Sequence, residues 1–338
     1  MQQPTGRGAV RPPIGIAFDG DTGNRIDAVL AIAMLNGMTA RTQARRISLS
    51  VSRPSLVSAQ VADVIAAFYR GRPMGGPGGG IGQAADGLIG LPEGKTVAAD
   101  APRLAAILAS KAADGTPNYT SSITGIVNTA ESAVMIRNLI LAQHDGNAAI
   151  VLAGPATGLV RILDLYRSGP QITAKVRALV VAAGAFPAGA AESSITADVA
   201  AAKRLFAEWP TPIVAVGSEV GDALPYPGTS IEKDFTWSPA HPVVEAYRAY
   251  KPMPYDASAP ALAAVLQAAF PDEGYFTLSE PGTIAVLDDG RTRFTPQADG
   301  KHRYLIVDAG QKDRVMTQYT SLVPAPPAPR PGRRGGAA

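Results

Sequence analysis

The chain has 338 residues, of which 46% are hydrophobic and 17% charged; this excludes a disordered protein and suits one large domain or two smaller ones. Three arginines near the C-terminus, Arg330, Arg333 and Arg334, account for the net charge of +3, so the rest of the chain gives no electrostatic reason to expect nucleic acid or an anionic membrane as a partner. Cysteine is absent and no apolar run reaches the ~20 residues that span a bilayer, which excludes thiol chemistry, disulfides and a predicted transmembrane helix.

The two ends of the sequence differ in composition from its body. Residues 1–13 are polar and rich in proline and glycine, which predicts a flexible N-terminal arm and not a signal peptide. Residues 14–322 are expected to form a single α/β domain. Residues 323–338 consist largely of proline, alanine, glycine and arginine, which predicts a disordered tail. The bare arm and the overall composition favour an exported or periplasmic protein over a cytoplasmic one.

Apolar runs of strand length alternate along the chain with segments of helical spacing. The runs at 176–183 and 213–216 are nearly continuous, as in strands buried on both faces of a parallel sheet. This alternation predicts an open, doubly wound, mostly parallel sheet flanked by helices. Residues 275–318 predict β-hairpins with a turn at 288–290. The predicted strands are 14–18, 47–51, 149–153, 178–182 and 213–217, and the predicted helices are 27–37, 56–69, 129–143, 156–166, 197–208 and 259–269.

An acidic loop follows the first predicted strand. It carries Asp19, Asp21 and Asp27. Carboxylates this close repel one another unless a positive charge lies among them, and a hard cation such as Ca²⁺ or Mg²⁺ prefers oxygen ligands. The loop therefore indicates a metal site. The alternative is an acidic turn in which Asp21 or Asn24 caps the following helix.

The segment from Asp19 to Ala28 resembles the acidic loop of the inosine/uridine-preferring nucleoside hydrolases. Many members read Asp-x-Asp-x-Gly-Asn-x-x-Asp-Asp there, and this chain reads Asp-Gly-Asp-Thr-Gly-Asn-Arg-Ile-Asp-Ala without a gap. Five further segments resemble motifs of that family, and the whole set spans about residues 14–265. These segments are 86–90, 151–159, 180–186, 192–198 and 255–260.

The resemblance implies a calcium-dependent hydrolase of the N-glycosidic bond of ribonucleosides, which releases base and ribose. In such enzymes Ca²⁺ holds the ribose hydroxyls and the attacking water. Asp21 would be a metal ligand and the base that deprotonates the water, with Asp19 supporting it from behind. Asp256 and the backbone carbonyl of Ala153 would be further ligands.

The same resemblance assigns the substrate contacts. Asp27 would bind a ribose hydroxyl, and Glu192 and Ser194 would face the other hydroxyls. Asp86 lies in the segment that resembles a substrate loop, and Tyr255 replaces a histidine that commonly precedes the late aspartate. Relatives are often dimers or tetramers, so the resemblance leaves a homo-oligomer open.

The leaving-group acid is not obvious from the sequence. His144 falls in a polar turn and His302 among the predicted hairpins, so both are expected to be structural or solvated. His241 is weighed as a pocket residue against a structural one. Tyr255 and Tyr226 remain as candidates, although a tyrosine with a pKa near ~10 is a weak acid at neutral pH.

Two positions of the acidic loop depart from the family pattern. Ala28 replaces an aspartate that supplies a metal ligand, which puts the calcium site in doubt, and Arg25 stands where many members have aspartate. A guanidinium among carboxylates competes with a cation for the same oxygens. Sliding the alignment by one residue would make Asp27 the ligand but would leave Ile26 at the ribose position.

Three hypotheses follow from these departures. The first is an active hydrolase in which another oxygen replaces the missing ligand. The second is a catalytically impaired member that binds a nucleoside or sugar-like ligand without Ca²⁺, in which Arg25 pairs with Asp21 or Asp27. The third is an interaction protein that acts through its Pro/Arg tail. Each acidic residue also has a structural explanation: Asp86 in a turn, and Glu192 and Asp256 at helix starts.

Overall fold

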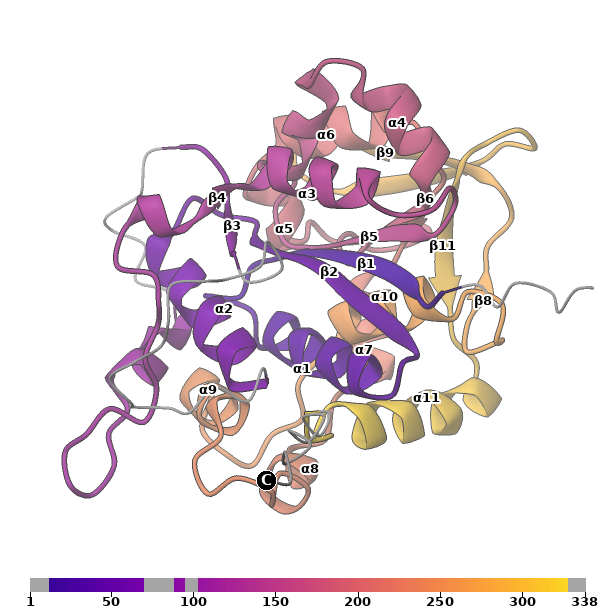
Figure 1. Cartoon of the computed structure of the whole chain (residues 1–338). Coiled ribbons are helices and arrows are strands. Elements are labelled where there is room, and N and C mark those ends of the chain that lie inside the picture. The colour runs from indigo at the N-terminus through magenta and orange to yellow at the C-terminus, as the bar shows by residue number, and fades with distance from the viewer. Residues whose placement is uncertain (1–11, 70–87, 95–102, 328–338) are drawn as a thin grey trace, which may run out of the picture.

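The computed structural model describes residues 12–69, 88–94 and 103–327 (Figure 1). Within these residues eleven strands form one sheet in the spatial order β10-β9-β11-β7-β6-β5-β1-β2-β3-β4, with β8 paired to β11. Neighbouring strands from β11 to β4 pair in parallel, whereas β8, β9 and β10 pair antiparallel. The strands are β1 (Ile14–Gly20), β2 (Ala44–Val51), β3 (Gly90–Leu91), β4 (Ala130–Glu131), β5 (Ala148–Ala153), β6 (Val176–Val181), β7 (Ile213–Ala215), β8 (Thr277–Leu278), β9 (Gly282–Val286), β10 (Thr292–Pro296) and β11 (His302–Ile306).

Helices cover both faces of the sheet, so its central strands are buried on both sides (Figure 1). One face carries α1 (Ile26–Ala40), α2 (Leu56–Tyr69), the 3₁₀ helix η2 (Arg103–Ala109), α7 (Ser218–Ala223), α8 (Gly228–Lys233), α9 (Pro242–Tyr250), α10 (Pro260–Ala269) and α11 (Ala309–Leu322). The other carries α3 (Ser132–Leu141), the 3₁₀ helix η4 (Leu159–Asp164), α4 (Ser168–Lys175), α5 (Ser193–Thr196) and α6 (Val199–Glu208). A third 3₁₀ helix, η3 (Ile126–Asn128), precedes β4.

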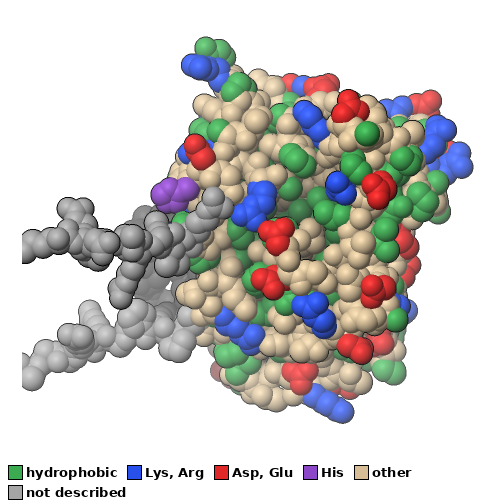
Figure 2. Space-filling model, turned by 90° about the vertical axis from the view of Figure 1, so that its right-hand side faces the viewer, with side chains coloured by type: hydrophobic (Ala, Val, Ile, Leu, Met, Phe, Trp, Pro, Cys, Tyr) green, Lys and Arg blue, Asp and Glu red, His purple; other side chains and the backbone are tan. Residues whose placement is uncertain are grey.

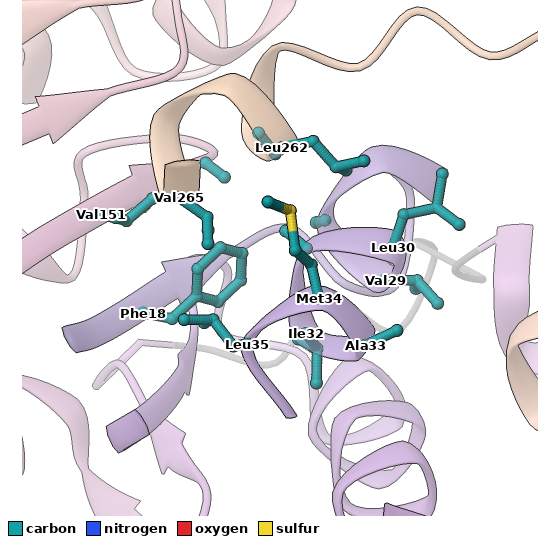
Figure 3. Close-up of a cluster of buried hydrophobic side chains, with 14 of the residues drawn as sticks. Phe18, Val29, Leu30, Ile32, Ala33, Met34, Leu35, Val151, Leu262 and Val265 are labelled. Carbon is teal, nitrogen blue, oxygen red and sulfur yellow. The ribbon is translucent and has the colours of Figure 1, made fainter. Parts of the chain in front are cut away.

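Helix α1 is the centre of the larger core. It is hydrophobic nearly all round, which is the pattern of a helix without a solvent face, and almost its whole length is buried. Figure 3 shows Met34 and Leu30 of α1 pointing toward Leu262 of α10, with Phe18 of β1 beneath Val265. Because this packing surrounds α1, it fixes the position of the acidic loop that leads into the helix.

The structure confirms the predicted doubly wound α/β fold and corrects two elements. Within the predicted helix 156–166 only Leu159–Asp164 are helical, and they form η4 and not an α-helix, since the N–H groups of Arg161 and Leu165 bond carbonyls three residues back and Gly158 disfavours the α-helix. The predicted hairpins end at β11, and residues 309–322 form α11. The expected turn at 288–290 joins β9 to β10, with Gly290 at φ +82°. Most of the expected arm and tail lies outside the described residues.

No helix in the described part of the chain is both long and apolar enough to span a membrane. Figure 2 shows one face of the molecule, on which acidic and basic side chains are interspersed with hydrophobic ones. This face has no extended patch of a single charge, in line with the near-neutral composition of the folded part.

Candidate active-site cavity

A cavity of about 570 Å³ opens at the carboxyl ends of β1, β6 and β7. In open α/β sheets, ligands bind outside the carboxyl ends of the strands, at the point where the strand order reverses direction. Here β1 lies between β2 and β5, so the loop after β1 occupies that turning point. The cavity is lined by Arg25 and Asp27 from this loop, by Glu192 and Ser193, and by the segment from Tyr250 to Pro260.

Asp19 is the most buried carboxylate of the acidic loop. It is the penultimate residue of β1 and pairs with Ser50 of β2, whose hydroxyl donates to Asp19 Oδ1 at 2.9 Å. The second oxygen, Oδ2, has no hydrogen-bond partner. Burial raises the pKa of Asp19 to about 7, against the lowering effect of the Ser50 hydrogen bond, and the negative charge of Asp21 adds to the rise. Asp19 therefore exchanges its proton near neutral pH.

Asp21 is held by two side chains. Asn24 Nδ2 donates to its Oδ1 at 2.9 Å, and Arg53 Nε donates to its Oδ2 at 2.6 Å. The backbone N–H of Asp21 also donates to the carbonyl of Ala153 at 3.0 Å. The backbone of Gly154, the next residue, packs directly against Ser52, because a Cβ at Gly154 would lie 2.2 Å from Ser52 Oγ. Asp21 is thus locked in an ion pair at the place where the resemblance puts a free metal ligand.

Arg25 links the acidic loop to the opposite wall of the cavity. Its Nε and Nη2 donate to Asp27 Oδ1 and Oδ2 at 3.0 and 2.8 Å, and its Nη1 donates to Ser194 Oγ at 2.7 Å and Glu192 Oε1 at 3.4 Å. Burial works to lower the pKa of Arg25, but the charge and hydrogen bond of Asp27 together with the charges of Glu192 and Asp21 outweigh it, so the pKa is raised. The expected pairing of Arg25 with Asp27 is confirmed, and the one with Asp21 is made by Arg53 instead.

Two of the alternative structural roles can now be compared with the geometry. Neither Asp21 nor Asn24 caps α1, since Arg25 stands at the cap position without a side-chain bond. Glu192 does act as a cap: its carboxylate accepts from the N–H of Ser194 at the start of α5. Glu192 therefore has a structural role and also faces the cavity.

The late segment supplies Tyr255 and Asp256. Both line the cavity. Asp256 Oδ1 accepts from the N–H of Gly228 at 2.8 Å, and the Tyr255 hydroxyl donates to the carbonyl of Tyr247 at 2.6 Å. Tyr226 does not line the cavity; it is fully buried and its hydroxyl bonds Ser230. Asp86 lies outside the described residues.

The donor set does not suit calcium. Ca²⁺ takes six to eight oxygen ligands. Both oxygens of Asp21 and of Asp27 already accept hydrogen bonds from arginine or asparagine, and the N–H of Ala261 adds a third bond to Asp27 at 3.0 Å. The buried methyl group of Ala28 adds no ligand. Among the described residues no three His, Cys, Asp or Glu side chains are arranged to hold a metal.

Several residues that line the cavity or hold the acidic loop were not predicted from the sequence. Arg53 follows the end of β2, which pairs with β1, so its position at the carboxyl edge of a parallel strand was the available signal. Arg103, Tyr250 and Lys251 line the cavity but lie in no motif, and only the packing of α9 against η2 brings them together.

His241 is structural and lies outside the cavity lining. It caps α9 through Nδ1, while Nε2 has no hydrogen-bond partner among the rings of Phe68, Phe235 and Trp237. Burial lowers its pKa to about 3. His144 is exposed in a turn, and His302 accepts from the N–H of Ile284, as expected of solvated and structural residues.

Acid is expected to destabilise the protein through His241. The folded state keeps the imidazole neutral while the unfolded state takes up a proton near pH 6.5, so stability is lost as the pH falls below that value. A His241→Asn variant keeps a capping side chain and removes this titration. Between pH 6 and 5 the parent should lose about 1.4 kcal/mol more than the variant, measured by urea unfolding. Parallel pH profiles would contradict this role.

The architecture and the position of the cavity define the class of fold: it is the nucleoside hydrolase fold. No family model matches the sequence. No curated protein matches it either. Solved structures do match it. One of them is a plant nucleoside hydrolase, which matches at a TM-score of 0.68 and 19% identity, over 93% of this chain and 100% of that one. These likenesses confirm the fold that the sequence resemblance implied.

Two further solved structures show the breadth of the fold. A purine-preferring ribonucleoside hydrolase from Gardnerella vaginalis matches at a TM-score of 0.64 and 16% identity, over 92% of this chain and 98% of that one. The type III effector protein XopQ, solved in complex with adenosine diphosphate ribose, matches at 0.63 and 12%, over 93% and 95%. Proteins described as hydrolases and as an effector therefore share this architecture.

Proposed function

We propose that this chain binds a nucleoside or another ribosyl compound in the cavity without a metal ion, and that it is impaired as a hydrolase. The observation that carries the proposal is the placement of Arg25. Its guanidinium lies among Asp27, Glu192 and Ser194, the side chains that the resemblance assigns to the sugar. A positive charge that belongs to the chain thus offsets one of the two carboxylate charges and bridges the carboxylates that would otherwise need a cation between them.

The cavity keeps groups that suit a sugar. Carboxylates accept hydrogen bonds from hydroxyls, and Asp27 and Glu192 both line the cavity. Tyr250 and Tyr255 add aromatic surface to the same lining, against which a base can pack. Ligand pockets of this kind combine apolar walls with a few polar groups that fix orientation.

Hydrolysis is the competing function, and the geometry opposes it at one step. Water must lose a proton to a base, and the resemblance gives that role to Asp21. Arg53 and Asn24 donate hydrogen bonds to both oxygens of Asp21, so neither oxygen is free to face a water molecule in the cavity. An active enzyme of this sequence would need calcium to displace Arg53 and Arg25 from their carboxylates.

The proposal predicts different responses to calcium and to nucleosides. Millimolar calcium should leave the melting temperature unchanged, whereas a nucleoside from a panel of inosine, adenosine and uridine should raise it, because a ligand that binds only the native state stabilises that state. Elemental analysis of the purified protein should find no stoichiometric calcium, and a reducing-sugar assay should find no ribose release above background.

Two outcomes would overturn the proposal. Stoichiometric calcium together with ribose release would establish the hydrolase and would mean that another oxygen compensates for Ala28. A melting temperature that no nucleoside of the panel raises would contradict the binding of a ribosyl ligand. A Tyr250→Leu variant locates binding, since it removes aromatic surface from the lining and leaves the pair of Arg25 with Asp27 intact, and it lowers the nucleoside-induced shift only if the ligand occupies this cavity.

A further inference from the structure

Two cations on the rim of the cavity have no carboxylate partner within the described residues. Arg103 begins η2 and Lys251 directly follows α9, and both side chains are exposed. Both cations lie over aromatic rings: the Arg103 guanidinium is 5.8 Å from the centroid of Tyr250, and Lys251 Nζ is 5.5 Å from that of Tyr255. Such contacts orient a cation without neutralising its charge.

The charged residues of the lining separate into a floor that carries one guanidinium and two carboxylates and a rim that carries two cations and one carboxylate. At the floor, Arg25 is paired with Asp27 and Glu192. The remaining carboxylate of the lining is Asp256, one oxygen of which accepts from the backbone. Arg103 and Lys251 therefore outnumber it, and the outer part of the cavity carries an excess of positive charge.

We propose that the ligand of this cavity carries a phosphate group, so that the chain binds phosphorylated ribosyl compounds in preference to free nucleosides. This inference rests on the proposed function. The carboxylates at the floor accept hydrogen bonds from sugar hydroxyls, and the two rim cations bind the phosphate. Arginine offers phosphate a bidentate contact and lysine a point charge. The depth difference between the buried Asp27 and the exposed cations matches a ligand with a hydroxylated end and an anionic end.

The preference can be measured by calorimetric titration of the full chain with adenosine, uridine and their 5′-monophosphates. We expect each monophosphate to bind roughly tenfold or more tightly than its nucleoside at low salt, because charge-assisted hydrogen bonds are the stronger kind. The advantage should shrink as salt is raised, since the rim is exposed.

Variants locate the effect. Arg103→Gln and Lys251→Gln should each reduce the ratio of monophosphate affinity to nucleoside affinity, and the double variant should bring that ratio close to one. Arg248→Gln is the matched control, because Arg248 lies on the same helix as Tyr250 but outside the cavity lining, and it should keep the preference.

The outcomes separate this inference from the proposed function. Equal affinity for nucleoside and monophosphate, or a preference that survives in the double variant, overturns the phosphate site and leaves the ribosyl cavity standing. Binding of the monophosphate alone supports the phosphate site. No binding of either overturns both.

Discussion

Replacing Arg25 with alanine is expected to lower the free energy of unfolding by about 3 to 5 kcal/mol, the usual cost of removing one partner from a buried ion pair. The side chains of Arg25 and Asp27 are 15% and 5% exposed. Without the guanidinium, Asp27 keeps only the backbone N–H of Ala261 as a donor, and the Ser194 hydroxyl keeps only its contact with Glu192. The loss would be measured by urea denaturation.

A surface arginine supplies the control for this measurement. Arg204 makes two short contacts with Asp164, as close as those between Arg25 and Asp27, but on the exposed face of α6. Exposed pairs contribute about 1 kcal/mol or less, so Arg204→Ala should have a small effect. If Arg25→Ala proved no more damaging than Arg204→Ala, the network around Arg25 would not be a structural part of the cavity floor.

The titration of Asp19 is expected to contribute a loss of up to about 4 kcal/mol of unfolding free energy as the pH rises from 4 to 7, opposite in sign to the contribution of His241. The unfolded chain releases this proton near pH 3.8, whereas the folded state keeps it until about pH 7. The native state therefore binds more protons across this window, and its advantage is lost as the pH rises. Above pH 7 both states are ionised and the full penalty of the buried charge remains.

An Asp19→Asn variant isolates this titration, because it keeps an oxygen that can accept from Ser50. The difference in unfolding free energy between variant and parent should shift steadily in favour of the variant from pH 4 to 7 and stay constant above. The slope of this difference is the quantity to measure, since any constant cost of burying the amide cancels. A flat difference would show that Asp19 ionises like a solvated carboxylate.

The strands of the central sheet were predictable because burial on both faces demands continuous apolar runs. β5 and β6 match their predicted ranges to within two residues at each end. Helix α11 was not predicted because the polar residues of its exposed face outnumber its apolar ones. Its apolar residues Val315, Tyr319 and Leu322 nevertheless recur at helical spacing. The capping box of Asp308 and Gln311 was the overlooked start signal.

For the cavity, the sequence was informative where partners are close along the chain. Arg25 and Asp27 are two residues apart, and their pairing followed from charge alone. The contacts of Arg25 with Glu192 and Ser194 cross more than 160 residues, so only the resemblance suggested that these side chains share a wall. The pair of Arg53 with Asp21 depends on β2 lying beside β1, a register that no local pattern encodes.

Because Arg25 is attached to the backbone, its charge cannot be removed by a chelator or lost to dilution. A tethered group has an effective concentration fixed by the chain that carries it, whatever the solution contains. The floor of the cavity would then keep one shape across any change in divalent-ion supply. A guanidinium, however, has no coordination site at which water can exchange. The residue that fixes the shape of this floor therefore cannot bind and position a water molecule next to a sugar as a metal ion would.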